Sequence, residues 1–206
     1  MYTIDKFYQY EQIINRSRFI CSLYPIKDLE EALSLLNQIR KQYHDATHNC
    51  YSYILGDAGE ITKSSDDKEP AQTAGVIIYD VLKKNELTNV LAVVTRYYGG
   101  TKLGAGGLIR AYSSSTSGAV READLLEITK CLVLEITCDY PYGDIITRIF
   151  SEAKELSKSF TNVVVLKYLI KATNKDDLIE KVTSATKNSI KIEVIAETTQ
   201  AFANGA

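Results

Sequence analysis

The alternation of hydrophobic and polar residues near the start of the chain predicts a pair of strands followed by a helix. Residues 8–26 interleave aromatic and aliphatic side chains with polar ones and are interrupted at 15–17, which indicates a hairpin or a bent strand pair. Apolar residues then recur at three and four spacing over 29–43, the period of an amphipathic helix. Asp28 and Glu31 form an acidic version of a capping box, so we expect the helix to begin there.

Between residues 48 and 122 the pattern continues and includes a turn rich in glycine. Residues 48–55 suit a strand, residues 56–70 are a polar loop dense in turn formers, and Pro70 is favoured in the first turn of the helix that follows. Residues 89–98 form a nearly continuous apolar run, which is typical of a strand covered on both faces. The glycine-rich turn comes next and leads into a helix that we expect to reach about residue 122.

The second half of the chain has the order strand, helix, strand, strand, helix, strand, which is that of a ferredoxin-like domain. Its segments are a strand from about 128, a helix with one apolar face over 145–153, two short strands within 158–171, a helix capped by Asn174, and a strand over 190–194. We therefore predict an α+β protein with two domains, residues 1–127 and residues 128–206, and a frayed end at 201–206.

The composition is that of a folded chain without a strong general attraction to polyanions. Hydrophobic residues make up 45% and charged residues 24%, and 24 Lys and Arg stand against 26 Asp and Glu, for a net charge of −2. Any binding to nucleic acid must therefore come from a local patch. The sequence has no apolar run of membrane-spanning length, no signal-peptide pattern and four scattered cysteines. We expect a cytoplasmic protein with reduced thiols, no membrane partner and no cofactor.

The most unusual segment is the glycine-rich turn, in which five glycines fall within nine positions between a buried strand and a helix. Glycines there let a ligand approach the backbone amides at the positive end of the helix dipole, and flanking cations would favour an anion such as phosphate. The alternative is a tight turn with close helix–sheet packing. The segment matches neither a Walker loop nor a dinucleotide fingerprint. The candidate phosphate-binding or nucleic-acid-binding residues are Arg96, Tyr97, Tyr98, Gly99, Gly100, Lys102, Gly104, Gly106, Gly107 and Arg110.

A second group of candidates lies in and before the polar loop. Asp66, Asp67 and Glu69 could hold Mg²⁺ or act as acid and base, but a solvated loop leading into a helix N-terminus explains such a short cluster better. His48 follows the expected end of the first long helix, and Cys50 is a weak candidate for a nucleophile beside it. We assign no catalytic residue and no metal ligand and leave the role of these residues open.

Four segments together resemble the Impact family, in particular its bacterial YigZ/YvyE-like members with two domains. They occur in the family's order over some 100 residues and are RSRFIC at 16–21, DATHNCYSYILG at 45–56, SDDKEPAQTAG at 65–75 and RYYGGTKLGAGGLIRAY at 96–112. The chain departs from the family's usual DDGEPxGTAG at Lys68 and Gln72, where glycine is common. Fewer glycines should stiffen this loop, and the added lysine weakens the case for a metal site.

The resemblance implies a fold and a cellular process. The first domain would be of the ribosomal-protein-S5 domain-2 type, similar to the fourth domain of elongation factor G, and the second would be similar to the fifth domain of that factor. Eukaryotic members act in translational control by binding the large activator protein of the amino-acid-starvation kinase, a pathway absent from bacteria and archaea. Some family names carry a proline dipeptidase label, but this sequence supplies no metal-ligand set for that reaction.

Three hypotheses about function remain open from the sequence. The first is a non-enzymatic, translation-associated regulator that binds RNA or the ribosome through the cationic glycine-rich turn. The second is an enzyme that acts on a phosphorylated ligand or nucleotide, with Asp66 or Asp67 as a base. The third is a protein-interaction module in a translation-control pathway. No DNA specificity is implied, and the oligomeric state is open.

Overall fold

A five-stranded antiparallel sheet forms the centre of the first half of the chain in the computed structural model, which describes residues 1–203. The long apolar run becomes the middle strand, and its residues from Val90 to Arg96 are all buried, as a strand covered on both faces requires. Across the sheet the strands are, in spatial order, β2 (Tyr8–Ile14), β3 (Ser17–Pro25), β6 (Val90–Tyr97), β4 (His48–Leu55) and β5 (Ile61–Ser65).

The predicted hairpin is confirmed, and its turn has two residues. Asn15 and Arg16 both have positive φ values, 45° and 66°, and Ile14 pairs with Ser17 across the turn. Two successive left-handed residues make the kind of turn whose twist matches that of the flanking strands, so the hairpin closes tightly. Its tip therefore projects from one end of the sheet in a fixed conformation.

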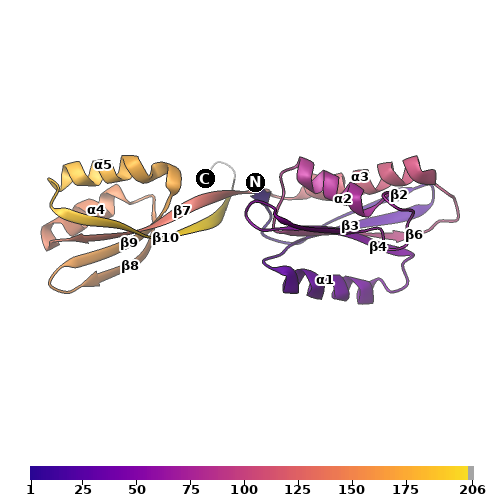
Figure 1. The fold of residues 1–206 in the computed structure, drawn as a ribbon, viewed down its shortest axis with the longest axis horizontal. Helices are drawn as coiled ribbons and strands as arrows, with labels where there is room; N and C mark the ends of the chain where they lie inside the picture. Colours follow the sequence, from indigo (N-terminus) through magenta and orange to yellow (C-terminus); the bar gives the residue numbers. More distant parts are fainter. Residues whose placement is uncertain (204–206) are drawn as a thin grey trace. The chain divides into compact units, whose positions relative to one another are not determined.

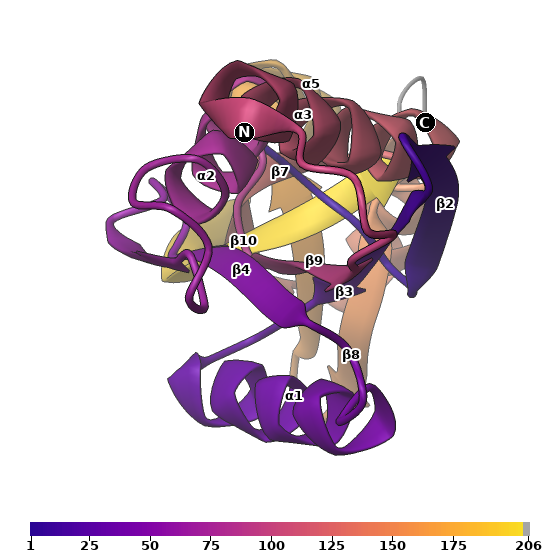
Figure 2. The same cartoon turned by 90° about the vertical axis from the view of Figure 1, so that its right-hand side faces the viewer.

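Helices cover both faces of this sheet (Figures 1 and 2). One face carries α1 (Leu29–Gln42), and the other carries α2 (Gly75–Lys84) and α3 (Gly104–Glu122). The predicted cap of α1 is confirmed, since the Asp28 carboxylate accepts a hydrogen bond of 2.8 Å from the Glu31 amide. Two separate apolar clusters result, one on each side of the sheet.

Two expectations for the segment between β4 and α2 are wrong. The polar loop contains the edge strand β5, which pairs with β4 on one side and leaves most of its residues exposed. Because an edge strand of this kind buries neither face, it lacks the apolar alternation by which strands are recognised. Pro70 does not lie in the first turn of α2, which begins five residues later at Gly75. It precedes instead a turn closed by a 3.2 Å hydrogen bond from the Thr73 amide to the Pro70 carbonyl.

The second half of the chain has the predicted order of strands and helices. Strand β9 lies between β8 and β7, and β7 also pairs with β10 and with the short β1. Two helices pack with these strands around one apolar cluster. Strand β1 (Tyr2–Thr3) comes from the start of the chain. The elements of the second half are β7 (Leu126–Cys138), η1 (Tyr140–Tyr142), α4 (Gly143–Ile149), β8 (Lys154–Phe160), β9 (Val164–Lys171), η2 (Ala172–Asn174), α5 (Lys175–Ala185) and β10 (Ile190–Ala203).

Details of this half differ from the prediction. Helix α4 ends at Ile149, and β8 begins four residues before the expected strand. Asn174 occupies the N-cap position of α5 but makes no capping hydrogen bond with its side chain. Strand β10 includes residues 201–203, where we expected fraying, and the rest of that expectation, 204–206, lies outside the described residues.

The described chain divides into two compact units. The first unit comprises Met1–Ile128 together with residues 201–203, and the second comprises Thr129–Gln200. Every residue predicted to form a site falls in the first unit. Within residues 1–203, no helix combines the length and the apolar character that crossing a bilayer would take.

Candidate functional site

The candidate residues gather at one end of the first sheet, where five segments meet. These are the β2–β3 turn, the start of β4, the loop between β5 and α2, the end of β6 and the turn that leads into α3. The register brings His48 opposite Arg96 in neighbouring strands, and the Arg16 backbone lies against Gly99. Residues far apart in the sequence are in contact here, such as Ser17 and Gly99, which are 82 positions apart. The site is thus made by the fold rather than by one motif.

A buried ion pair lies at the centre of this end. Arg96 Nη1 donates to Glu69 Oε1 over 2.5 Å, and both side chains are more than nine-tenths buried. The same oxygen accepts a 2.9 Å hydrogen bond from the Tyr112 hydroxyl, and Arg96 Nη2 lies 3.4 Å from Ser17 Oγ. The guanidinium also lies over the ring of Phe19, at 5.4 Å. The charge of Arg96 is therefore compensated inside the protein and is not presented at the surface.

One nitrogen of this arginine lacks a partner. Among the described residues, Arg96 Nε is a fully buried side-chain donor without a hydrogen bond. A buried donor left unpaired costs roughly 1–3 kcal/mol, so the remaining contacts of the guanidinium must offset that penalty. Arg96 therefore keeps this buried position despite the free-energy penalty of its unpaired Nε.

His48 and Cys50 border the ion pair but do not form a catalytic pair. His48 Nε2 lies 3.8 Å from Glu69 Oε2, and its Nδ1 is hydrogen-bonded to the Asp67 carbonyl at 2.9 Å. The Cys50 thiol donates instead to the Asp66 carbonyl and to the Tyr112 hydroxyl, over 2.9 and 3.3 Å. Burial raises the pKa of Cys50 far above its ordinary value. The side chain stays a thiol at neutral pH, which argues against a nucleophile.

The three acidic residues of the loop point to three different partners. The Asp66 carboxylate accepts hydrogen bonds from the amides of Gln72, Ala74 and Gly75, at 2.7–3.0 Å, and so caps the start of α2. Asp67 Oδ2 accepts from the Asn49 amide at 2.6 Å. Glu69 belongs to the ion pair, and within the part of the chain that is described no three His, Cys, Asp or Glu residues are arranged to hold a metal. The three carboxylates are therefore engaged in contacts that hold the conformation of the loop.

The loop has a left-handed backbone at Lys68 and Gln72, the two positions where the resemblance led us to expect glycine. Lys68 has φ 72° and Gln72 has φ 62°, both in the left-handed region that glycine adopts without strain. Asp67, with φ 39°, is left-handed as well. The chain therefore keeps a glycine-type backbone at 68 and 72 although side chains are present.

The glycines of the turn serve two structural purposes. A side chain at Gly99 would overlap the backbone of Arg16, whereas Gly100 and Gly104 have φ values of 83° and 67° with open space around them. A Cβ at Gly107 would lie 3.0 Å from Leu103 Cβ. Gly106 meets neither requirement, because its φ is not positive and an added Cβ would be 3.8 Å from Arg110 Nη1. Packing explains Gly99 and Gly107, the left-handed backbone explains Gly100 and Gly104, and Gly106 is left without a structural reason.

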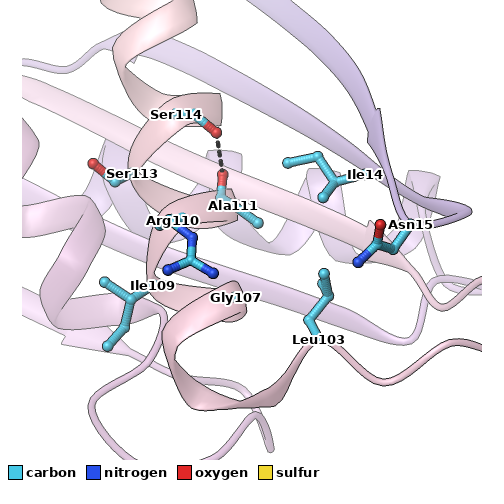
Figure 3. A pocket seen from close by; sticks show the side chains of 9 residues that line it. All are labelled: Ile14, Asn15, Leu103, Gly107, Ile109, Arg110, Ala111, Ser113 and Ser114. Atoms are coloured by element: carbon cyan, nitrogen blue, oxygen red, sulfur yellow. Dashed lines mark hydrogen bonds between the residues drawn. The ribbon is translucent and has the colours of Figure 1, made fainter.

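The outer layer of the site is cationic. Lys102 and Arg110 are exposed, and no ion pair engages either of them within residues 1–203. Helix α3 begins without a capping side chain and without an acid in its first turn. Figure 3 shows the Arg110 guanidinium turned back toward that first turn. The uncapped first turn of α3 is therefore preceded in the chain by one exposed cation, Lys102, and approached by a second, Arg110.

A pocket of about 530 Å³ lies beside this layer, between the hairpin tip and α3 (Figure 3). Its lining combines aliphatic side chains with one arginine and three polar residues. The lining residues are Ile14, Asn15, Leu103, Gly107, Ile109, Arg110, Ala111, Ser113 and Ser114. Arg110 thus faces both the start of the helix and a concave surface.

Sequence reasoning missed two residues that hold the site together. Tyr112 lies on the apolar side of α3 and is fully buried, so its spacing indicates only a core residue, yet its hydroxyl links Cys50 to Glu69. Ser17, also fully buried, accepts from Arg96 and from the Gly99 amide. Both belong to segments quoted above as motifs, which was the signal available in the sequence.

Known proteins resemble this chain over most of its length. The family described as the Impact N-terminal domain matches residues 15–120. The chain is 41% identical over 157 residues to IMPACT family member YvyE of Bacillus subtilis, which covers 76% of this chain and 72% of that protein. It is 29% identical over 188 residues to IMPACT family member YigZ of Escherichia coli, covering 89% and 92%. A crystal structure of a hypothetical protein aligns with TM-score 0.62 and 26% identity over 95% of this chain and 97% of that one.

Proposed function

The chain belongs to the Impact family, and on this premise we propose that it is a non-enzymatic, translation-associated regulator that binds RNA in the cytoplasm, including the RNA surface of the ribosome. Binding occurs through the exposed residues around the glycine-rich turn, chiefly Lys102, Arg110 and Tyr98. The buried pair of Glu69 and Arg96 fixes the geometry of that surface from below and does not itself contact the RNA.

The observation that carries the proposal is that the exposed cations Lys102 and Arg110 lack ion-pair partners in the described part of the chain, whereas the carboxylates at this end of the sheet already have partners within the protein. Lys102 and Arg110 have no acidic partner among the described residues, whereas the acids around them are already engaged. The engaged carboxylates and their partners are Glu11 with Arg18, Asp45 with Tyr97, Asp66 with the α2 amides, Asp67 with Asn49, and Glu69 with Arg96. Lys102 and Arg110 therefore present two positive charges that no ion pair neutralises within residues 1–203, although the whole chain carries −2. Phosphate contacts supply most of the affinity for nucleic acid, so such a patch is sufficient for a local contact.

A likeness of fold to ribosome-associated domains is the second ground for the proposal that the protein acts at the ribosome. We take the first unit to be of the ribosomal-protein-S5 domain-2 type and the second to be similar to the fifth domain of elongation factor G. Two units of this kind in this order favour a protein that acts at the ribosome. Likeness of fold supports this setting only by analogy, and the charges of Lys102 and Arg110, unpaired in the described chain, remain the main ground for RNA binding.

The test is co-sedimentation of the purified protein with ribosomal subunits and with isolated ribosomal RNA, at low and at moderate salt. The variant Lys102→Ala/Arg110→Ala should lose most of the binding, and the wild-type binding should weaken as salt rises. The control variant Lys83→Ala/Lys84→Ala removes the same charge from the last turn of α2, at the other end of that helix from the loop. It should bind like the wild type.

Arg96 is kept unchanged in the test variant for a physical reason. Its removal would leave Glu69 buried without a counter-charge, so a loss of binding could reflect unfolding. Equal binding by the wild type and the Lys102→Ala/Arg110→Ala variant would overturn the proposal. A partner that is captured as well after digestion of RNA as before it would replace the proposal by a protein-interaction function.

A further inference from the structure

The two adjacent tyrosines at the end of β6 have different environments. Tyr97 is half-buried, its hydroxyl donates to Asp45 Oδ1 over 2.9 Å, and its ring lies under the Arg18 guanidinium at 5.7 Å. Tyr98 keeps 45% of its surface exposed. Only Tyr98 therefore has an aromatic surface that is still available to a ligand.

The backbone around Tyr98 is held on both sides. Its own amide donates to Thr47 Oγ1 over 2.9 Å, and the next amide, that of Gly99, donates to Ser17 Oγ over 3.2 Å. Gly99 also packs so closely on the Arg16 backbone that no side chain would fit. The position of the ring is thus set by the fold before any ligand arrives, which lowers the cost of ordering it on binding.

The ring is also supported from within the protein. The Arg96 guanidinium lies 5.5 Å from the centre of the Tyr98 ring and is itself held by Glu69 and Ser17. An arginine in this position attracts the π-electrons of the ring and keeps it from turning away. The buried ion pair therefore acts as the support of an exposed aromatic surface.

We propose that Tyr98 is the platform on which one unpaired base of single-stranded RNA stacks, while the adjoining phosphates contact Lys102 and Arg110; this rests on the function proposed above. Lys102 follows Tyr98 by four residues, so their Cα atoms lie within about 14 Å of each other. Base–aromatic stacking needs a free base face, which single strands offer and duplexes do not. A preference for single-stranded over double-stranded RNA follows.

The test measures binding of a short single-stranded RNA, with one 2-aminopurine to report stacking, and of a duplex of the same sequence. Tyr98→Ala should weaken binding of the single strand roughly 5- to 100-fold and abolish the quenching of 2-aminopurine, because stacking on an aromatic residue is lost. Tyr98→Phe keeps the ring and should bind like the wild type. Tyr97→Phe, the matched control, loses only its hydrogen bond to Asp45 and should also bind normally.

A second variant guards against misfolding. Tyr98→Leu retains an apolar cover over Arg96 but has no π-face. It should stay folded, with only the small loss of melting temperature that follows from the missing cation–π contact, and bind as weakly as Tyr98→Ala. If both variants bind single-stranded RNA like the wild type while Lys102→Ala/Arg110→Ala does not, the stacking platform is refuted and the proposed function stands. Equal affinity for the duplex and the single strand also refutes it. If the wild type binds neither RNA nor ribosomes, the proposed function fails and the platform with it.

Discussion

Arg96 and Arg110 flank the same glycine-rich turn, yet the fold gives them opposite situations. Arg96 is 5% exposed and paired with Glu69, and Arg110 is exposed without an ion-pair partner in the described chain. The alternation of side chains along β6 decides this. Arg96 follows Val90, Ala92 and Val94 on the face of the strand that α2 and α3 cover, whereas Arg110 lies on the exposed side of α3. A cation near a glycine-rich turn is therefore available to a ligand only if no buried acid neutralises it.

Replacing each arginine by alanine should give the largest difference in the free energy of unfolding between the two positions. Arg96→Ala should lower the free energy of unfolding by about 3–5 kcal/mol, because Glu69 would be left as a buried, unpaired charge. Arg110→Ala should change it by no more than about 0.5 kcal/mol, as is usual for exposed residues. Urea unfolding followed by circular dichroism measures both values.

The origin of the loss at Arg96 can be checked with a double variant. Replacing both partners, as in Glu69→Leu/Arg96→Met, removes the buried charge altogether and should recover much of the stability lost in Arg96→Ala. A cost of less than about 1 kcal/mol for Arg96→Ala alone would contradict the description of this pair as buried and mutually dependent.

The acidic loop and the cationic turn differ in the same way, because the loop's carboxylates are bound within the fold and Lys102 of the turn is exposed. Replacing Asp66 should have the next largest effect on the free energy of unfolding. Asp66→Ala removes the group that accepts three amides at the start of α2, and should destabilise the protein by about 1–2 kcal/mol. Asp66→Asn keeps an acceptor in place and should cost less. Lys102→Ala, the counterpart in the turn, should leave the melting temperature unchanged, and a loss there equal to that of Asp66→Ala would remove the contrast.

The sequence was sufficient to predict most of the elements because their signals are local. The hairpin turn at Asn15, the cap at Asp28 and the apolar run of β6 each follow from neighbouring residues. The edge strand β5 was missed because neither of its faces is buried, and Pro70 was misplaced because the cap of α2 comes from Asp66 instead.

Within the site, the sequence identified the residue types but not their partners. Glu69 and Arg96 are 27 residues apart, and Tyr112 lies a further 16 beyond Arg96, so only the sheet register and the position of α3 bring them together. Long-range pairing of this kind depends on tertiary packing, which no local pattern records. For this reason Arg96 was grouped with the surface cations and Tyr112 was not singled out.

The left-handed residues of the acidic loop predict a smaller effect of opposite sign. Lys68→Gly and Gln72→Gly should each stabilise the protein by about 0.5–1 kcal/mol, because relief of left-handed strain exceeds the extra freedom that glycine gains on unfolding. Ala71→Gly, between them, has no positive φ to relieve and should destabilise. Equilibrium unfolding of the three variants under one set of conditions decides this, and destabilisation by all three would show that the loop carries no strain at 68 and 72.

Gly106 predicts a small effect on stability and sharpens the comparison between packing and ligand binding within the turn itself. Gly106→Ala should raise the free energy of unfolding by up to about 1 kcal/mol, because alanine favours the helix and its Cβ meets only Arg110 Nη1 at an ordinary distance. Gly104→Ala, with φ 67°, should instead destabilise. If RNA binding falls in the more stable Gly106→Ala variant, the missing side chain leaves room for the ligand at the helix start. If binding is unchanged, the RNA contacts Lys102 and Arg110 without approaching the backbone of α3, and the anion-binding role of these amides is excluded.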